Sequence, residues 1–161
     1  MKFFDDIKIG ETAVFGEHTF AADEIKRFAA QFDPQSFHLD EAAAARSHFG
    51  ALCASGWHTV VMWMRLAILY NRAADEARRA RGEPAARLGA SPGFRDLKWP
   101  KPVYVGDTVR YATEVVEIRP SRSRPTWGLV FNRNTGTNQA GELVMSFIGS
   151  GFVERRPRAQ P

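Results

Sequence analysis

The stretch from about Ser55 to Arg81 constrains the fold of this chain more than any other feature. Its composition is helical, and its first half is apolar on nearly every side, which is typical of a buried helix. Its second half, "RAADEARRARG", is polar, and Gly82 is a residue at which helices commonly end. The sequence therefore predicts one long helix whose first half is buried inside the protein.

The residues after this helix predict consecutive β-strands. Segment 108–118 alternates between apolar and polar residues, and segments 126–135 and 141–153 are strand-like and follow turn-forming runs. Residues 83–94 are predicted to form a loop. An antiparallel sheet wrapped around the long helix would bury the apolar surface of both elements. We therefore expect an α+β fold.

Shorter elements are predicted before the long helix. Residues 13–20 are typical of a strand, and the apolar residues of "AADEIKRFAAQF" recur at the spacing of an amphipathic helix. Pro34 disfavours helical geometry at Asp33, so this helix should end there. A second short helix is expected after Asp40, because aspartate is favoured at helix N-caps.

The composition is that of an ordinary globular protein, with 44% hydrophobic and 25% charged residues. A length of 161 residues suits one domain. We expect a single domain over residues 1–161, with a flexible tail from about residue 155. The single cysteine, Cys53, excludes an internal disulfide framework and fits a reducing compartment.

Two further absences bear on where the protein works. The first residues, "MKFFDDIKIGE", lack the apolar core of a signal peptide. The most apolar run, Trp57 to Tyr70, is too short and too polar to span a membrane. We therefore expect a cytoplasmic protein that makes no use of a membrane.

The chain carries a net charge of +4, from 22 Lys and Arg against 18 Asp and Glu. Part of the excess lies in residues 78–87 and in the tail "ERRPRAQP". These residues fit either a solvated surface or attraction to an anionic partner, such as a phosphorylated cofactor or an acidic carrier protein. A nucleic-acid partner is not expected, because aromatic residues do not alternate with the basic ones as a stacking platform requires.

Several common functional sites are not supported by the residues. The four histidines are spaced ten or twenty residues apart, which is not a ligand spacing on one helix or strand; they are His18, His38, His48 and His58. One cysteine cannot form a zinc cluster. We therefore expect no metal site. The surroundings of Ser55, "LCASGWH", lack the first glycine of a serine-hydrolase elbow. Phosphate-binding and dinucleotide-binding glycine motifs are also missing.

Asp33 and His38 are the strongest candidates for chemistry. They flank the exit of a predicted helix, where they form either a structural corner or an acid/base pair, and their spacing leaves both open. They lie outside the apolar stripe of that helix, so their replacement is expected to cost little stability. Downstream, Ser55 and Gly56 should open the long helix, whose exposed amides carry a partial positive charge. Such amides could stabilise a carbonyl oxygen as an oxyanion hole.

Three segments resemble the MaoC-like dehydratases, relatives of the (R)-specific enoyl-CoA hydratases. They are "FAAQFDPQSFHLDEAAAARSHFGALCASGWHT", "LKWPKPVYVGDTV" and "NQAGELVMSF", and the resemblance runs from about Phe4 to Arg156. It implies a single hotdog domain that dimerises sheet to sheet and binds an acyl thioester near the dimer interface. It also implies catalytic roles for Asp33 and His38, and an oxyanion amide at Gly56 beside Ser55.

The chain departs from the hydratase pattern at four positions. Gln35 and Ser36 stand where the hydratases have Asn and Pro, and Ser55 stands where they usually have His. Met64 occupies the place of a small polar residue on the family's helix. The acid/base pair survives these changes, which bear on substrate choice and rate.

The resemblance implies a hydro-lyase that adds water reversibly to a 2-enoyl thioester carried by coenzyme A or an acyl carrier protein. Coenzyme A would enter as part of the substrate, and no other cofactor is expected. A homodimer or larger homo-oligomer is expected as well. A hotdog thioesterase is an alternative, although Trp57 to Tyr70 contains no carboxylate for it. A non-catalytic module that binds acyl thioesters is another.

Overall fold

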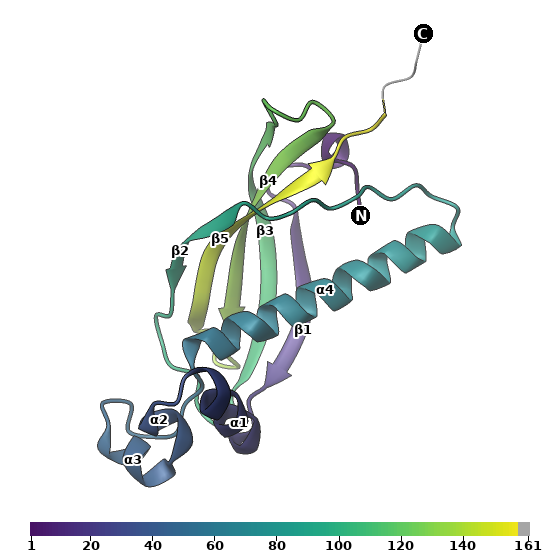
Figure 1. Ribbon diagram of the computed structural model, residues 1–161. Helices are drawn as coiled ribbons and strands as arrows, with labels where there is room; N and C mark the ends of the chain where they lie inside the picture. Colours follow the sequence, from purple (N-terminus) through teal and green to yellow (C-terminus); the bar gives the residue numbers. More distant parts are fainter. Residues whose placement is uncertain (158–161) are drawn as a thin grey trace.

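One long helix lies across one face of a five-stranded antiparallel sheet in the computed structural model of the chain, which describes residues 1–157 (Figure 1). The helices are α1 (Ala22–Phe32), α2 (Ser36–Leu39), α3 (Glu41–Arg46) and α4 (Gly56–Ala80), after a 3-10 turn at Phe4–Asp6. The strands are β1 (Thr12–Thr19), β2 (Gly93–Lys98), β3 (Thr108–Pro120), β4 (Trp127–Thr137) and β5 (Leu143–Glu154). The order in the sheet is β1-β3-β4-β5-β2. This is the predicted α+β hotdog fold.

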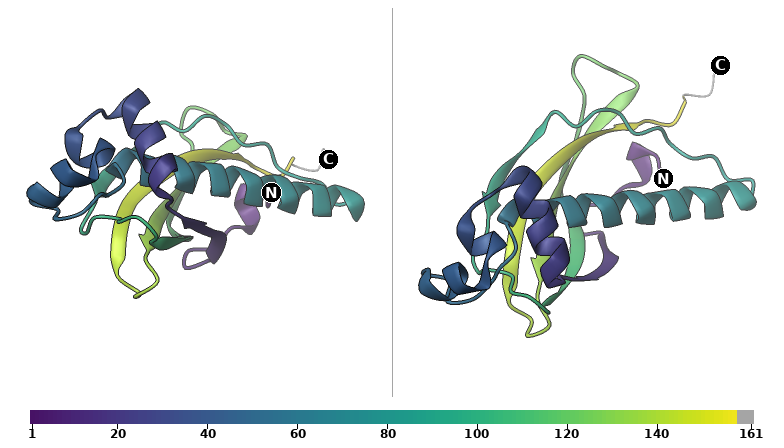
Figure 2. Two further views of the ribbon diagram at one scale, coloured as in Figure 1. Left: turned by 90° about the horizontal axis from the view of Figure 1, so that it is seen from below. Right: turned by 60° about the horizontal axis from the view of Figure 1, so that its bottom comes forward.

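The main core lies between α4 and the sheet. Its central side chains include Met62 from α4, Tyr111 from β3 and Met145 from β5. The short helices α1, α2 and α3 gather at the N-terminal end of α4 in both further views (Figure 2). The segments that carry the candidate site residues therefore meet at this end of the core.

The local signals for helix ends are confirmed. Asp33 leaves helical geometry at φ −152° directly before Pro34. The Asp40 carboxylate accepts a hydrogen bond from the Ala43 amide at 2.7 Å, as an N-cap does. Ser55 caps α4 in the same way, because its hydroxyl accepts from the Trp57 amide at 3.2 Å.

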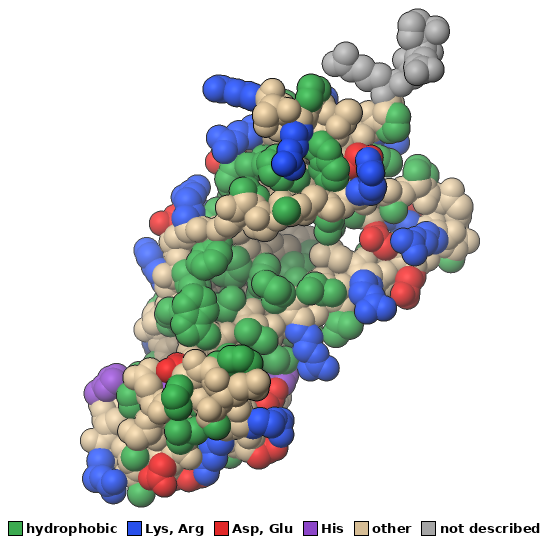
Figure 3. All heavy atoms as spheres, in the orientation of Figure 1, with side chains coloured by type: hydrophobic (Ala, Val, Ile, Leu, Met, Phe, Trp, Pro, Cys, Tyr) green, Lys and Arg blue, Asp and Glu red, His purple; other side chains and the backbone are tan. Residues whose placement is uncertain are grey.

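The prediction that the first half of α4 is buried is wrong for one of its faces. His58 and Met62 point toward the sheet and are 2% and 4% exposed. The opposite face, the exposed apolar face of α4, holds four side chains that are each 50% to 52% exposed: Trp57, Val61, Met64 and Ile68. Figure 3 shows hydrophobic side chains gathered over this part of α4 and the neighbouring β2. One sheet can cover only one side of a helix, so the other side stays open in the single chain.

Strand β2 and the single-turn helix α2 were not predicted from the sequence. β2 pairs with β5 at the edge of the sheet, where Phe94 is the register partner of Gly149. The pairing is irregular between Arg95 and Lys98, and Asp96 has a positive φ of 58°. This irregular edge strand lacks the alternation that marks a strand in sequence.

The end of the last strand is held by ion pairs. Arg155 and Arg156 each contact a carboxylate near the N-terminus, Asp5 and Asp6 respectively, at 2.8 Å. The expected flexible tail begins at these two arginines, and its flexibility stays a prediction. Its remaining part, residues 158–161, lies outside the described residues.

None of the helices within residues 1–157 has the length and apolar composition that crossing a membrane requires.

Candidate active site

The fold brings Asp33 and His38 together. Asp33 is the C-cap of α1, and His38 projects from the short helix α2 that follows. The Asp33 Oδ2 and His38 Nε2 atoms are 3.5 Å apart. The His38 ring is buried, whereas the Asp33 side chain is 20% exposed, so the pair lies where the core meets an opening.

A backbone carbonyl sets the tautomer of His38. The His38 Nδ1 atom lies 2.7 Å from the carbonyl oxygen of Cys53, which can only accept a hydrogen bond. Nδ1 must therefore carry the hydrogen, and the Nε2 of the neutral ring is an acceptor directed at Asp33. Two acceptors at this separation can both accept from one molecule that has two hydrogens to donate, such as water.

The Asp33 carboxylate is held by two donors. The Ser55 hydroxyl donates to Oδ2 at 2.7 Å, and the Gln35 side-chain amide donates to Oδ1 at 2.8 Å. Burial acts to raise the pKa of Asp33, but these hydrogen bonds and the nearby His38 outweigh it, and the pKa lies below its ordinary value. Asp33 is therefore a carboxylate at neutral pH, with fixed orientation.

Ser55 and Gly56 lie beside this pair at the start of α4. Ser55 is 1% exposed and links the end of α1 to the first turn of α4 through its two hydrogen bonds. Within residues 1–157, no acceptor is paired with the Gly56 amide. This amide is one of the free donors at the positive end of a 25-residue helix.

The Trp99 indole lies directly against Gly56. A Cβ atom added at Gly56 would come within 2.5 Å of the indole ring, closer than carbon atoms can approach. Trp99 also packs edge-on against Trp57, with ring centroids 5.3 Å apart. A side chain at position 56 would therefore force the Trp99 indole to move, whatever else the Gly56 amide does.

These residues line a cavity of about 460 Å³. The lining comes from residues 33–38, 49–59 and 99–103, together with Val144. Asp33 is the only acidic side chain among the lining residues in the described part of the chain, and aromatic and aliphatic side chains dominate the remainder. Such a cavity suits a largely apolar ligand with one polar group to be acted upon.

Three residues of this site were not assigned a role from sequence. Gln35 had been noted only as a departure from a family pattern, yet it holds the Asp33 carboxylate. Trp99 lies in "LKWPKP", which carried the resemblance without indicating a contact with Gly56. Cys53 contributes its backbone carbonyl. Every residue has this group, so the identity of the residue could not predict the contact.

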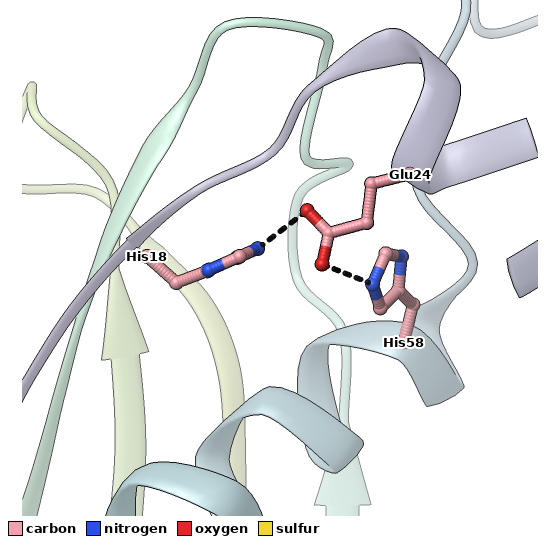
Figure 4. Close-up of side chains that lie close together, drawn as sticks. All are labelled: His18, Glu24 and His58. Carbon is pink, nitrogen blue, oxygen red and sulfur yellow. Dashed lines mark hydrogen bonds and ion pairs between the residues drawn. The ribbon is translucent and has the colours of Figure 1, made fainter. Parts of the chain in front are cut away.

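A second group of polar side chains was missed altogether. His18 on β1 and His58 on α4 lie on either side of Glu24 on α1 (Figure 4). The expectation of no metal site rested on the spacing of histidines within one helix or strand. Packing of β1 against α4 removes that constraint, because it brings His58 close to His18 although the two are forty positions apart in the sequence.

Burial shifts the pKa of His58 and that of the nearby Tyr111. It lowers the pKa of His58, an effect that the nearby Glu24 carboxylate partly opposes. Burial, followed by the charge of Glu24, raises the pKa of the Tyr111 phenol. Neutral forms of both rings are therefore favoured around the Glu24 carboxylate.

The chain matches a known protein family over most of its length. Residues 6–130 match the family described as MaoC like domain. Among solved structures, a MaoC-like dehydratase from Rhodospirillum rubrum is 37% identical, with a TM-score of 0.81. The alignment covers 98% of this chain and 99% of that one.

Two curated proteins with named activities are also similar. The mesaconyl-CoA hydratase of Cereibacter sphaeroides is 25% identical over 161 residues, which are 99% of this chain and 43% of that protein. The chain therefore spans less than half the length of this hydratase. The 3-hydroxybutyryl-CoA dehydratase of Methylorubrum extorquens is 29% identical over 122 residues, which are 76% of this chain and 69% of that protein.

Proposed function

Because the chain belongs to the MaoC-like domain family, we propose that it is a hydro-lyase that adds water reversibly to a 2-enoyl thioester. The observation that carries this proposal is the 3.5 Å separation of Asp33 Oδ2 and His38 Nε2 at the wall of an apolar cavity. Both atoms are acceptors when His38 is neutral. They are suited to hold one water molecule by its two hydrogens.

Addition of water needs three operations. The water oxygen must attack C3 of the enoyl group while it loses a proton, and C2 must gain a proton. The Asp33–His38 pair accepts one proton from water and supplies one to C2, so that H and OH add across the double bond. Positioned acids and bases of this kind contribute typically ~10²–10⁴-fold each.

The third operation is stabilisation of the enolate oxygen that forms on the thioester carbonyl. In our proposal the Gly56 amide donates to this oxygen, aided by the positive end of α4. Gly56 is one of the residues that line the cavity, which supports this role. Loss of one such donor typically costs ~10²–10³-fold in rate.

The substrate we propose is an acyl-CoA, or the same acyl group on a carrier protein. The names of the two curated relatives both specify coenzyme A thioesters. Coenzyme A arrives as part of the substrate, and the proposed chemistry needs no other cofactor. The cytoplasm remains our proposed location, in keeping with the single, unpaired Cys53.

We further propose a homodimer in which a second copy covers the exposed apolar face of α4. Large exposed apolar surfaces on a single chain usually mark an interaction site. Here the surface continues onto edge strand β2, where Phe94 is 59% exposed. Trp57 belongs both to this face and to the cavity lining, so the substrate would bind close to the interface.

An assay on a panel of 2-enoyl-CoA and 3-hydroxyacyl-CoA substrates tests the function. Loss of the conjugated double bond reports hydration, and release of free thiol reports thioester hydrolysis. We expect hydration by the wild type, a loss of ~10²–10⁴-fold in Asp33→Asn, and no loss in Asp23→Asn. Asp23 is a matched control on the same helix, and its side chain is 79% exposed.

Three outcomes would contradict the proposal. Thiol release without hydration would identify a thioesterase. Saturable binding of acyl-CoA without any turnover would identify a non-catalytic binding module. Full hydration activity in Asp33→Asn would remove the proposed acid/base role.

A further inference from the structure

His18, Glu24 and His58 converge from three separate elements outside the cavity. His18 comes from β1, Glu24 from the first turn of α1, and His58 from the first turn of α4. The two imidazoles point toward opposite oxygens of the one carboxylate (Figure 4). None of the three lines the cavity that holds Asp33 and His38, so the proposed hydration does not use them.

The distances between their donor atoms approach those of a metal site. His18 Nε2 lies 2.9 Å from Glu24 Oε2, and His58 Nε2 lies 3.7 Å from Glu24 Oε1. One ligand atom from each residue can be chosen so that all lie within 4.8 Å of one another. Atoms that bind one zinc ion at about 2.0–2.2 Å lie roughly 3.3 Å apart. Small side-chain rotations would therefore bring all three into contact with one ion.

The neighbourhood also holds buried polar atoms that lack hydrogen bonds. The His58 Nδ1 atom and the Tyr111 hydroxyl are buried and have no partner within the described chain. The 3.7 Å contact of His58 Nε2 is too long for a hydrogen bond. Within the described residues, the His58 ring therefore makes no hydrogen bond at Nδ1 and only a long contact with Glu24 at Nε2, so an ion at Nε2 would not displace a hydrogen bond.

Aromatic side chains fix the orientation of the two imidazoles. Phe28 stacks on His58 with ring centroids 4.4 Å apart and an interplanar angle of 4°. Phe20 packs edge-on against both His18 and His58, at 4.8 Å and 5.0 Å. Ligands held in place before an ion arrives lose little entropy when they bind it.

We propose that His18, Glu24 and His58 bind one divalent transition-metal ion, with zinc as the representative. Two imidazoles and one carboxylate form a ligand set typical of zinc and similar ions. Magnesium and calcium prefer sites built from oxygen ligands alone. With three protein ligands, the ion keeps a fourth position for water.

The position of the site indicates a structural role. The ion would join β1 to the start of α1 and the start of α4. Helix α1 ends at Asp33, and α4 begins directly after Ser55, which donates a hydrogen bond to Asp33. Metal binding would therefore restrict the relative motion of the two helices that position the Asp33–His38 pair.

Zinc binding to the tag-free, chelator-treated full chain tests the proposal. Calorimetric titration should give one zinc ion per chain, and cobalt used as a probe should give the visible absorption of a four-coordinate ion. Glu24→Gln and His18→Asn should each weaken zinc binding by roughly tenfold or more. The matched controls Glu17→Gln and His48→Asn, which change the same residue types outside the cluster, should bind zinc as the wild type does.

Zinc should also raise the melting temperature of the wild type and slow amide exchange at the end of α1 and the start of α4. Neither effect should occur in Glu24→Gln. His18, whose side chain is 17% exposed, provides a second variant that keeps the test decisive if Glu24→Gln does not fold.

Three outcomes would overturn the proposal. They are a wild type that binds no zinc, equal zinc binding by the ligand variants and the controls, and displacement of zinc by magnesium. These measurements do not depend on hydratase activity.

Discussion

His38 has both a polar and a packing role, which changes what its replacement should do. Its Nδ1–H group satisfies the Cys53 carbonyl, and the ring is 5% exposed. For a truncation to alanine, this geometry predicts a larger loss of stability than the sequence did. Such a variant leaves a buried carbonyl without its donor, at a cost of about 1–3 kcal/mol.

A better replacement for His38 is asparagine, whose side-chain NH₂ can take the position of Nδ1. We predict that His38→Asn retains most of the stability but loses ~10²–10⁴-fold in hydration rate, as does Asp33→Asn. The double variant should be barely slower than either single variant, because two groups that hold one water act as a unit. Measurement of kcat/KM and thermal unfolding on all three variants checks this. Independent, multiplicative losses would contradict a shared water.

The pH dependence of the reaction should depend on Ser55. Removal of its hydroxyl in Ser55→Ala takes away a hydrogen bond that lowers the pKa of Asp33. The pKa of Asp33 should rise, and the acidic limb of the kcat/KM profile should move to higher pH. Asp40→Ala is the matched control, because it removes another N-cap at a similar cost of about 1 kcal/mol. Its acidic limb should stay in place.

The same shift has a consequence for stability. The pKa of Asp33 is lower in the folded chain than its ordinary value. Ionisation of Asp33 therefore stabilises the fold at every pH above that ordinary pKa. This contribution is lost as the pH falls through the lowered pKa. Ser55→Ala should bring the folded-state pKa of Asp33 closer to its ordinary value. The stability that this variant loses relative to the wild type should therefore be smaller in acid than at neutral pH. An unfolding series across this pH range measures the effect.

At the scale of elements, the start of α4 depends on the segment that carries Trp99. This segment follows β2 and lies against the first turn of α4, so that the indole contacts Gly56. The sequence indicated a helix start here, from a serine followed by glycine. The reason for the glycine, however, is a contact across more than forty residues of chain.

Gly56→Ala should therefore disturb this junction. The new Cβ would lie 2.5 Å from the indole, which forces Trp99 to move, at a typical cost of about 1–3 kcal/mol. The shift should also reduce substrate binding, because Trp99 lines the cavity. Gly151→Ala is the matched control, since a Cβ there meets no atom within 4 Å. Thermal unfolding and KM measured on both variants check the prediction, and equal behaviour would contradict it.

At the scale of the whole molecule, α4 has two apolar faces and the sheet covers one. Core side chains such as Met62 are buried against the sheet, whereas Met64 is 51% exposed. An apolar helix face of this size is unfavourable in water and favours association. The proposed homodimer would bury it.

Met64→Glu should therefore shift the assembly from dimer to monomer. A carboxylate at the centre of an apolar interface would lose its hydration without gaining a partner. The fold of each chain should survive, because Met64 lies on the outside of the single chain. Light scattering at micromolar concentration measures the mass. Ile9→Glu, at a side chain 63% exposed and outside this face, should remain a dimer. A wild type that is already monomeric would contradict the prediction.

The sequence by itself determined the features that depend on neighbouring residues. Pro34 ends α1 because its ring excludes helical geometry at the preceding residue. Asp40 and Ser55 begin helices because their side chains accept from backbone amides two or three residues on. The pattern of the long helix and the later strands also sufficed for an α+β fold in which a sheet packs on the helix, since few arrangements bury both. The hotdog fold itself was implied by the resemblance to the MaoC-like dehydratases.

Only the tertiary structure decided which distant side chains meet and which apolar face stays open. The Ser55–Asp33 hydrogen bond and the approach of His18 to His58 depend on how α1, β1 and α4 pack. Spacing along the chain cannot show such contacts, because a turn can return residues of any separation to the same place. The sequence of α4 likewise shows that both of its faces are apolar. It does not show that the sheet of this chain covers only one of them.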